Sequence, residues 1–203
     1  FFTDWAEINL SARTQKAASE MLEGVNSLVS ELSELDTSAI AQEIETPSQA
    51  IPKRGQIYQE MVKFFKKDDW FFVPLEEQPV LQMSFQGDSG KWTCYARARE
   101  QQRQFLFYSV CSLNAPENKL ASIAEFISRA NYGMAVGNFE LDFTDGEIRY
   151  KTSIDVDGNQ LNFDFIRSLV YTNVMMMDRY LPGIMWVIQG EMEAEAAILQ
   201  VEG

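Results

Sequence analysis

The strongest folding signal in this chain lies in residues 80–111, VLQMSFQGDSGKWTCYARAREQQRQFLFYSVC. Apolar and polar residues alternate on both sides of GDSG at 87–90, and this period of two is typical of a half-buried β-hairpin. With 87–90 as the loop, Phe85 faces Trp92 and Met83 faces Cys94. Residues 105–111 form a further apolar run that folds back beside the second strand. The stretch therefore predicts an antiparallel meander.

A second hairpin is predicted at residues 138–152, where Asp145-Gly146 lies between alternating apolar residues and indicates a two-residue turn. This turn places Phe143 opposite Ile148 on the apolar face. The polar face then pairs acids with bases, namely Asp142 with Arg149 and Glu140 with Lys151. The acidic residues of this stretch thus have basic partners and require no ligand.

Helical periodicity surrounds these strands. Residues 56–67 carry an apolar stripe, and residues 114–133 have Asn114 and Gly133 as expected amino- and carboxyl-terminal caps. Residues 161–188 form a long helix expected to kink or break near Pro182, and the final residues also favour a helix. The order predicts an α+β fold, in which an antiparallel sheet of meander plus hairpin is flanked by helices.

The amino-terminal quarter differs from the rest of the chain. Residues 1–50 carry a net charge of −7, and one helix face repeats apolar residues at steps of three and four: Met21, Val25, Leu28, Leu32 and Leu35. Prolines and small polar residues at 45–55 indicate a linker. We therefore expect an acidic helical extension and linker at 1–50 and one α+β domain at 51–203.

Charge limits the partners of the protein. The 203 residues have a formal net charge of −13, which disfavours binding to nucleic acid and to anionic membrane surfaces. No apolar run approaches the roughly 18 residues that span a bilayer, and no signal peptide is recognisable at the start. These features predict a cytoplasmic protein.

Catalytic and cofactor sites have little support in the sequence. Histidine is absent, so every catalytic arrangement that depends on histidine is excluded, and no glycine-rich phosphate loop occurs. Cys94 and Cys111 have inward parity on neighbouring strands, and they are either two buried thiols or a cross-strand disulfide, depending on the register. We expect no enzyme activity, no catalytic residues, no cofactor and no metal.

Residues 153–164, SIDVDGNQLNFD, partly match a calcium-binding loop. Ser153, Asp155 and Asp157 occupy the first, third and fifth positions, with Gly158 sixth and Asp164 twelfth. Ser at the first position and the short Asp at the twelfth depart from the pattern. The alternative is a strand-to-helix turn in which Asn162 or Asp164 caps the following helix.

The long helix carries Met175, Met176 and Met177, which give it apolar residues on more than one face. It is either buried between the sheet and the amino-terminal segment or in contact with another subunit. Trp70, Trp92 and Tyr132 are expected in the core.

Three stretches together resemble the YbjN family of bacterial sensory transduction regulators, especially its cyanobacterial branch: GKWTCYARAREQQRQFLFYSV, RANYGMAVGNFELDFTDGEIRYKTS and VYTNVMMMDRYLPGIMWVI. The resemblance covers about residues 56–190. It implies a fold similar to type III secretion chaperones, small proteins that commonly dimerise and bind partner polypeptides.

The resulting functional hypothesis is a non-enzymatic protein-binding module, chaperone-like or regulatory, that forms a homodimer and binds an unidentified protein. A calcium-responsive binding module that uses the 153–164 loop is the alternative.

Overall fold

The computed structural model describes residues 55–76, 78–157 and 159–203. The expected amino-terminal extension therefore lies outside the described residues. Along the described chain, the elements follow the order helix, four strands, helix, two strands and two helices, with one short 3₁₀ turn before the second helix. This order confirms the predicted α+β class.

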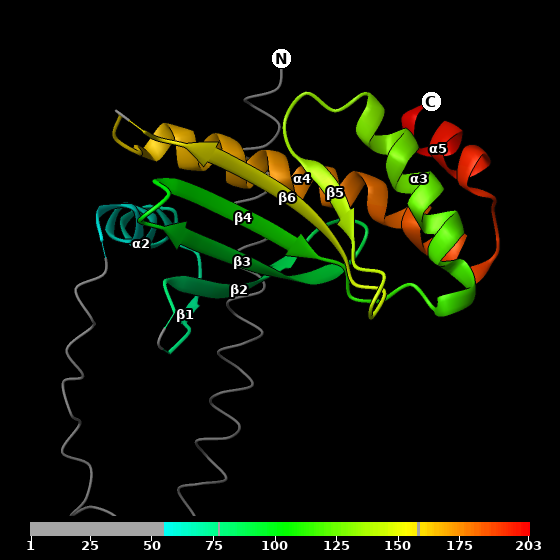
Figure 1. The fold of residues 1–203 in the computed structure, drawn as a ribbon, viewed down its shortest axis with the longest axis horizontal. Helices are drawn as coiled ribbons and strands as arrows, with labels where there is room; N and C mark the ends of the chain where they lie inside the picture. The colour runs from blue at the N-terminus through cyan, green and yellow to red at the C-terminus, as the bar shows by residue number, and fades with distance from the viewer. Residues whose placement is uncertain (1–54, 77, 158) are drawn as a thin grey trace, which may run out of the picture. The chain divides into compact units, whose positions relative to one another are not determined.

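The strands form one antiparallel six-stranded sheet with the order β1-β2-β3-β4-β6-β5 (Figure 1). Their bounds are Val73–Pro74 (β1), Val80–Gln86 (β2), Lys91–Arg99 (β3), Gln104–Val110 (β4), Asn138–Leu141 (β5) and Ile148–Asp155 (β6). The meander has the predicted register, since Phe85 pairs with Trp92 and Met83 with Cys94. β4 then pairs with β3.

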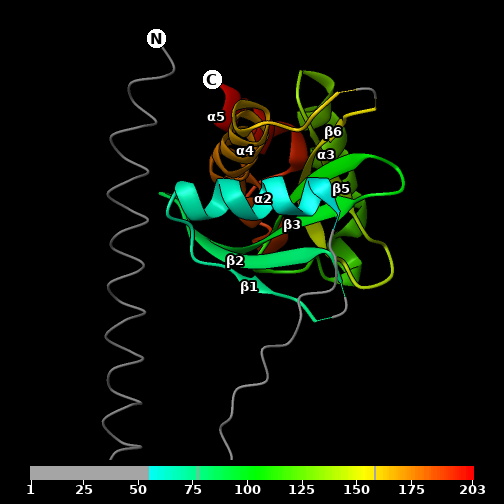
Figure 2. The same ribbon diagram turned by 90° about the vertical axis from the view of Figure 1, so that its left-hand side faces the viewer.

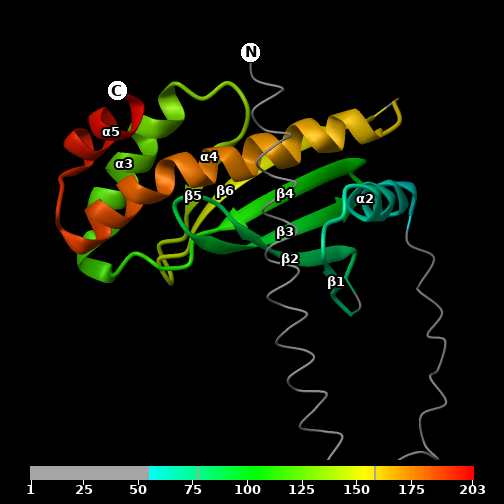
Figure 3. The same ribbon diagram turned by 180° about the vertical axis from the view of Figure 1, so that it is seen from behind.

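Helices α2 (Gln56–Lys67) and α4 (Phe163–Gln189) cover one face of the sheet. They lie in front of the strands when the molecule is seen from behind (Figure 3), whereas no helix lies in front of β2, β3 and β4 in Figure 1. The view in Figure 2 shows the same two layers from the side. The apolar side of each strand faces α2 and α4. Against it α2 buries its apolar stripe, which consists of Ile57, Met61, Phe64 and Phe65.

Three side chains of α2 and α4 hold this layer to the sheet and to each other. Asn173 is fully buried, and its Nδ2 donates to the carbonyl oxygens of Phe107 on β4 (3.0 Å) and Tyr150 on β6 (3.1 Å). At the end of α2, Asp68 accepts a hydrogen bond from the Tyr171 hydroxyl of α4 at 2.6 Å. These buried and half-buried bonds fix how α4 crosses the strands.

The long helix was expected to kink or break near Pro182, and the break is absent, because α4 is a single helix of 27 residues that contains Pro182. Its carboxyl-terminal part is held between α3 (Leu120–Tyr132) and α5 (Ala194–Glu202), with Leu181 and Ile184 buried. Despite its length, α4 is not apolar enough to cross a membrane, and the same holds for each other helix in the described residues.

The second hairpin is present, but its predicted register is wrong by two residues. Leu141, not Phe143, lies opposite Ile148, and Phe139 lies opposite Tyr150. The loop is longer than a two-residue turn because Gly146 N–H donates to the Asp142 carbonyl at 2.8 Å. A shift of two preserves the parity of the strands, so the side chains of β5 and β6 stay on their predicted faces, whereas Phe143 lies in the loop and is 64% exposed.

The segment before α3 explains the longer loop. Ala115 N–H donates to the Gly146 carbonyl at 2.8 Å, and Asn114 Nδ2 donates to the Asp145 carbonyl at 3.1 Å. Gly146 has φ +77°, and a Cβ there would lie 2.0 Å from the Ala115 oxygen. Asn114 therefore binds the hairpin loop and does not cap the helix as predicted.

The helix itself begins after a 3₁₀ turn, η2 (Glu117–Lys119), with Lys119 at its amino-terminal cap position. Its carboxyl-terminal cap is Gly133, as predicted.

Candidate protein-binding site

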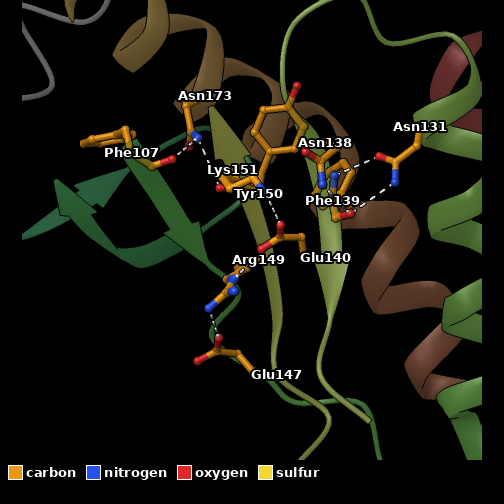
Figure 4. Close-up of polar contacts among 10 residues, drawn as sticks. All are labelled: Phe107, Asn131, Asn138, Phe139, Glu140, Glu147, Arg149, Tyr150, Lys151 and Asn173. Atoms are coloured by element: carbon orange, nitrogen blue, oxygen red, sulfur yellow. Dashed lines mark hydrogen bonds and ion pairs between the residues drawn. The ribbon is translucent and has the colours of Figure 1, made fainter. Parts of the chain in front are cut away.

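Each acidic residue of the second hairpin between positions 140 and 147 accepts a hydrogen bond within the hairpin, and Figure 4 shows those of Glu140 and Glu147. Glu140 accepts a hydrogen bond from Arg149 Nε at 2.8 Å and a second from Lys151 Nζ. Burial by itself raises the pKa of Glu140, but the bonds from Lys151 and Arg149 outweigh burial and hold the pKa below its ordinary value. Asp142 accepts from the Thr144 N–H at 2.8 Å and has no hydrogen bond to Arg149, contrary to the predicted pairing. This cluster is a structural ladder.

In the loop that partly matches a calcium site, the Asp155 carboxylate accepts hydrogen bonds from within the fold. Asp155 accepts from the Asp157 N–H at 2.9 Å and from Gln104 Nε2 at 3.4 Å. Asn162 caps α4 by accepting from the Phe165 N–H at 3.0 Å, as the alternative interpretation predicted. Within the described residues, no three His, Cys, Asp or Glu side chains are grouped to hold a metal ion.

Both cysteines are buried free thiols. The register places Cys94 opposite Ser109, so Cys111 does not lie across from it. Burial raises the pKa of Cys94 to about 12, against weaker hydrogen-bonding effects of Ser109 and Trp92. Cys94 therefore remains a neutral thiol at neutral pH and offers no thiolate nucleophile.

An open cleft lies between α4 and the loop that joins α3 to β5. It has a volume of about 440 Å³ and is lined by Gly133, Met134, Ala135, Val136, Thr172, Met176, Arg179, Tyr180 and Glu202. The loop is held in place by the Tyr150 hydroxyl, which donates to the Val136 carbonyl. The wall of the cleft is mainly apolar, with Arg179 and Glu202 as charged groups. Such a composition suits an apolar side chain of a ligand.

The tyrosine in this cleft is a neutral hydrogen-bond donor. Tyr180 O–H donates to Glu202 Oε1 at 2.7 Å and joins α4 to α5. Burial, followed by the contact with Glu202, raises the pKa of Tyr180 to about 12. The hydroxyl consequently stays protonated at neutral pH, and it cannot act there as a base.

The three consecutive methionines of α4 have different surroundings. Met177 is buried in the core, Met176 lines the cleft, and Met175 is 38% exposed. The helix therefore presents apolar surface that the other described residues leave uncovered. Trp70 and Trp92 are in the core as expected, but Tyr132 is 96% exposed, so its predicted core position is wrong.

Sequence reasoning did not predict the cleft. Met134 and Val136 follow the capping Gly133 and lie in a loop, where apolar residues have no periodicity to assign them to a face. The available signal was their composition, because MAV is an apolar run outside any predicted helix or strand. Thr172 and Met176 come from the opposite side of the cleft, and only the fold brings them to this loop.

A single family describes much of the chain. Residues 59–185 match the model of YbjN, described as "Putative bacterial sensory transduction regulator". A search among curated proteins gives no significant match.

Three solved structures are similar to the chain in fold. The crystal structure of "YbjN, a putative transcription regulator from E. coli" has 10% sequence identity and a TM-score of 0.49, and the match covers 66% of this chain and 90% of that one. The HopA1-SchA chaperone-effector complex has 10% identity and a TM-score of 0.42, with 61% and 92% covered. The ExsC-ExsE complex has 12% identity and a TM-score of 0.38, with 60% and 87% covered.

The family match includes more than half of the chain and all six strands of the described sheet. It agrees with the resemblance found in the three sequence stretches. The chain belongs to the YbjN family.

Proposed function

We propose that this protein is a non-enzymatic regulatory module, chaperone-like in that it binds another polypeptide, and that the cleft beside α4 holds an apolar side chain of that partner. The observation that carries the proposal is the cleft itself, which is open, mainly apolar and about 440 Å³ in volume. The description of the family as a regulator supports the same class of function.

The lining of the cleft suits a protein partner. Met134 and Met176 have flexible thioether side chains that adapt to ligands of different shape. Arg179 and Glu202 provide both charges at the same site, which suits the polar backbone on either side of a buried peptide anchor. The proposed location of the module is the cytoplasm, where thiols such as Cys94 and Cys111 stay reduced.

Substitution of the two neighbouring methionines tests the cleft. Affinity purification of the full chain from its native cell identifies the partner, and the affinity of the purified pair is then measured. Met176→Glu places a charge in the cleft, so we expect binding to weaken at least about tenfold. Met175→Glu adds the same charge to the same helix outside the cleft.

The control variant decides between the cleft and the helix as a whole. Met175→Glu is expected to bind nearly as well as the wild type. Equal loss in both variants, with both still folded by circular dichroism, contradicts a role for the cleft. Recovery of no specific partner in repeated purifications contradicts the proposed binding function.

We also propose that the protein forms a homodimer. The proposal rests on the apolar surface of α4 that the other described residues leave uncovered at Met175, and two-fold dimers are the commonest homo-oligomers. Light scattering on the eluting full chain is expected to give twice the monomer mass of 23.2 kDa. A mass of 23.2 kDa across the accessible concentration range contradicts the dimer without affecting the test of the cleft.

A further inference from the structure

The face of the sheet opposite α2 and α4 is not covered by any described element (Figure 1). It carries the alternate residues of each strand whose side chains point away from α2 and α4, and the register places these side chains next to one another. Arg97 lies between Val80 and Leu106, and Tyr95 lies opposite Tyr108. This surface, formed by β2 to β6, is called the open sheet face below.

The open sheet face is basic although the protein is acidic. It carries five basic side chains against two acidic ones: Lys91, Arg97, Arg99, Arg149 and Lys151 against Glu140 and Asp155. The whole chain has a net charge of −13. The open sheet face is therefore positively charged although the whole chain is negatively charged, and no described helix covers this face.

Some of these cations are already paired and others are not. Glu140 takes up Arg149 and Lys151. Arg97 is exposed at the centre of the face and has no ion-pair partner among the described residues, and the same holds for Lys91 at the end of β3. An unpaired guanidinium beside apolar groups provides a bidentate site for a carboxylate.

The apolar part of the face lies directly beside these charges. Leu106 is only 7% exposed, Tyr95 and Tyr108 are half-buried, and the guanidinium of Arg149 lies 4.9 Å from the centre of the Tyr108 ring. Flat aromatic side chains bury area at low cost in conformational entropy, and they are frequent in protein-binding surfaces. The face thus combines an apolar centre with basic groups around it.

We propose that the open sheet face binds an acidic, extended segment of a polypeptide that presents carboxylates and apolar side chains on the same side, two residues apart. The carboxylates bind Arg97 and Lys91, and the apolar side chains pack on Tyr95 and Tyr108, which are half-buried. This surface is distinct from the cleft beside α4, so the inference goes beyond the proposed function and does not depend on it.

A peptide fits this face better than a nucleic acid does. Double-stranded DNA carries one charge per about 1.7 Å, and a polyanion of that density is repelled by a protein of net charge −13. Glu140 and Asp155 also interrupt the basic residues of the face. Carboxylates four residues apart on an extended segment are separated by about 13 Å, so the charge density of the segment is far lower than that of DNA and both repulsions are weaker.

The test uses a fluorescein-labelled peptide of 12 residues with the repeat glutamate-serine-leucine-serine, which places glutamate and leucine on one side of an extended chain. It is titrated with the full chain in about 50 mM salt, where exposed charges are weakly screened. We expect saturable binding that weakens as salt is raised. The charge reversal Arg97→Glu is expected to reduce affinity about tenfold or more. Lys66→Glu is the matched control, because Lys66 is exposed on α2 at the other face of the sheet.

Two results with the peptide contradict the proposal: no binding at all, and equal weakening by Arg97→Glu and Lys66→Glu, which would show that only the overall charge of the protein matters. Equally tight binding of the same peptide with glutamine in place of glutamate also contradicts it, because apolar contact alone would then explain the affinity. Tighter binding of single-stranded DNA of equal charge is the fourth contradicting outcome. Circular dichroism verifies that each variant is folded. Met176→Glu is expected to leave this affinity unchanged, which separates the open sheet face from the cleft.

Discussion

Asn131 shows, at the scale of single residues, how this domain uses polar side chains to satisfy its backbone. Its Oδ1 accepts from the Phe139 N–H at 2.8 Å, and its Nδ2 donates to the Phe139 carbonyl at 3.1 Å (Figure 4). Both backbone groups belong to β5, the last strand of the sheet order. One amide therefore takes the place of a neighbouring strand at this point.

Substitution of Asn131 is predicted to destabilise the fold. Asn131→Ala leaves the Phe139 N–H unpaired and leaves the Phe139 carbonyl with only Asn138 Nδ2, at 3.2 Å, as a side-chain donor, so we expect a loss of about 1–3 kcal/mol in the free energy of unfolding, measured with denaturant. Asn118→Ala removes the same type of side chain at an exposed site and is expected to change stability by less than about 0.5 kcal/mol. Equal effects of the two substitutions contradict this role of Asn131.

Glu140 is predicted to make stability depend on pH. Its folded-state pKa lies below the ordinary value of 4.5. Its contribution is therefore complete above pH 4.5 and is lost as pH falls through the folded-state pKa. Glu140→Gln removes this contribution, so the unfolding free energy should fall less steeply below pH 4.5 than in the wild type. Some slope remains, because the Thr144 backbone N–H also lowers the pKa of Asp142. Parallel curves for variant and wild type contradict the prediction.

At the scale of elements, the two hairpins differ in how far local sequence specifies them. The loop at 87–90 has the predicted length, and the register of β2 and β3 follows from it. In the second hairpin, Asp145-Gly146 indicates a tight turn, but Asp142 and Asp145 each accept a nearby backbone N–H and stabilise a longer loop. The contact with Ala115 completes that loop, and local sequence gives no sign of a partner 31 residues away.

The long helix also fixes the tip of the first hairpin. Asp178 on α4 accepts from the Asp88 N–H at 3.0 Å and from the Ser89 N–H at 2.7 Å. Gly87 permits this approach, because a Cβ there would lie 2.2 Å from Asp178 Oδ1. A carboxylate on a helix thus orders a loop that precedes it by about 90 residues.

Removal of this carboxylate is predicted to loosen the hairpin tip. Asp178→Ala is expected to speed hydrogen exchange of the Asp88 and Ser89 amides and to lower stability by about 1–2 kcal/mol. Asp164→Ala changes an exposed aspartate at the other end of the same helix and should leave those two amides unchanged. If exchange at the tip is the same in all three proteins, Asp178 does not order the loop.

At the scale of the whole molecule, the sequence predicts the fold better than the binding surfaces. Alternation identified the strands and assigned Met83, Phe85 and Trp92 to the covered face. The cleft combines the loop at 133–136 with α4 and Glu202 of α5. No local pattern links residues so far apart in the chain, because their proximity depends on how three helices pack around the end of the sheet.

The buried thiols provide a measure of global stability. Cys94 and Cys111 are 0% and 4% exposed, and burial raises the pKa of both. We expect a thiol reagent to label the native protein only at the rate of unfolding. Ser84→Cys, at an exposed position on β2, should add one thiol that reacts immediately. Rapid labelling of either native cysteine in the wild type contradicts this prediction.

The Asn131 side chain, which covers β5 at Phe139, also limits how copies of the sheet can join. α3 lies beside this strand, and Asn131 occupies its hydrogen-bonding groups at Phe139. β5 is therefore closed to strand addition at Phe139, whereas no described strand pairs with the outer side of β1. A sheet that can pair along one edge only can join one further copy through that edge. The Asn131 side chain thus acts against edge-to-edge growth of the sheet on the β5 side, which is the growth that leads to fibres.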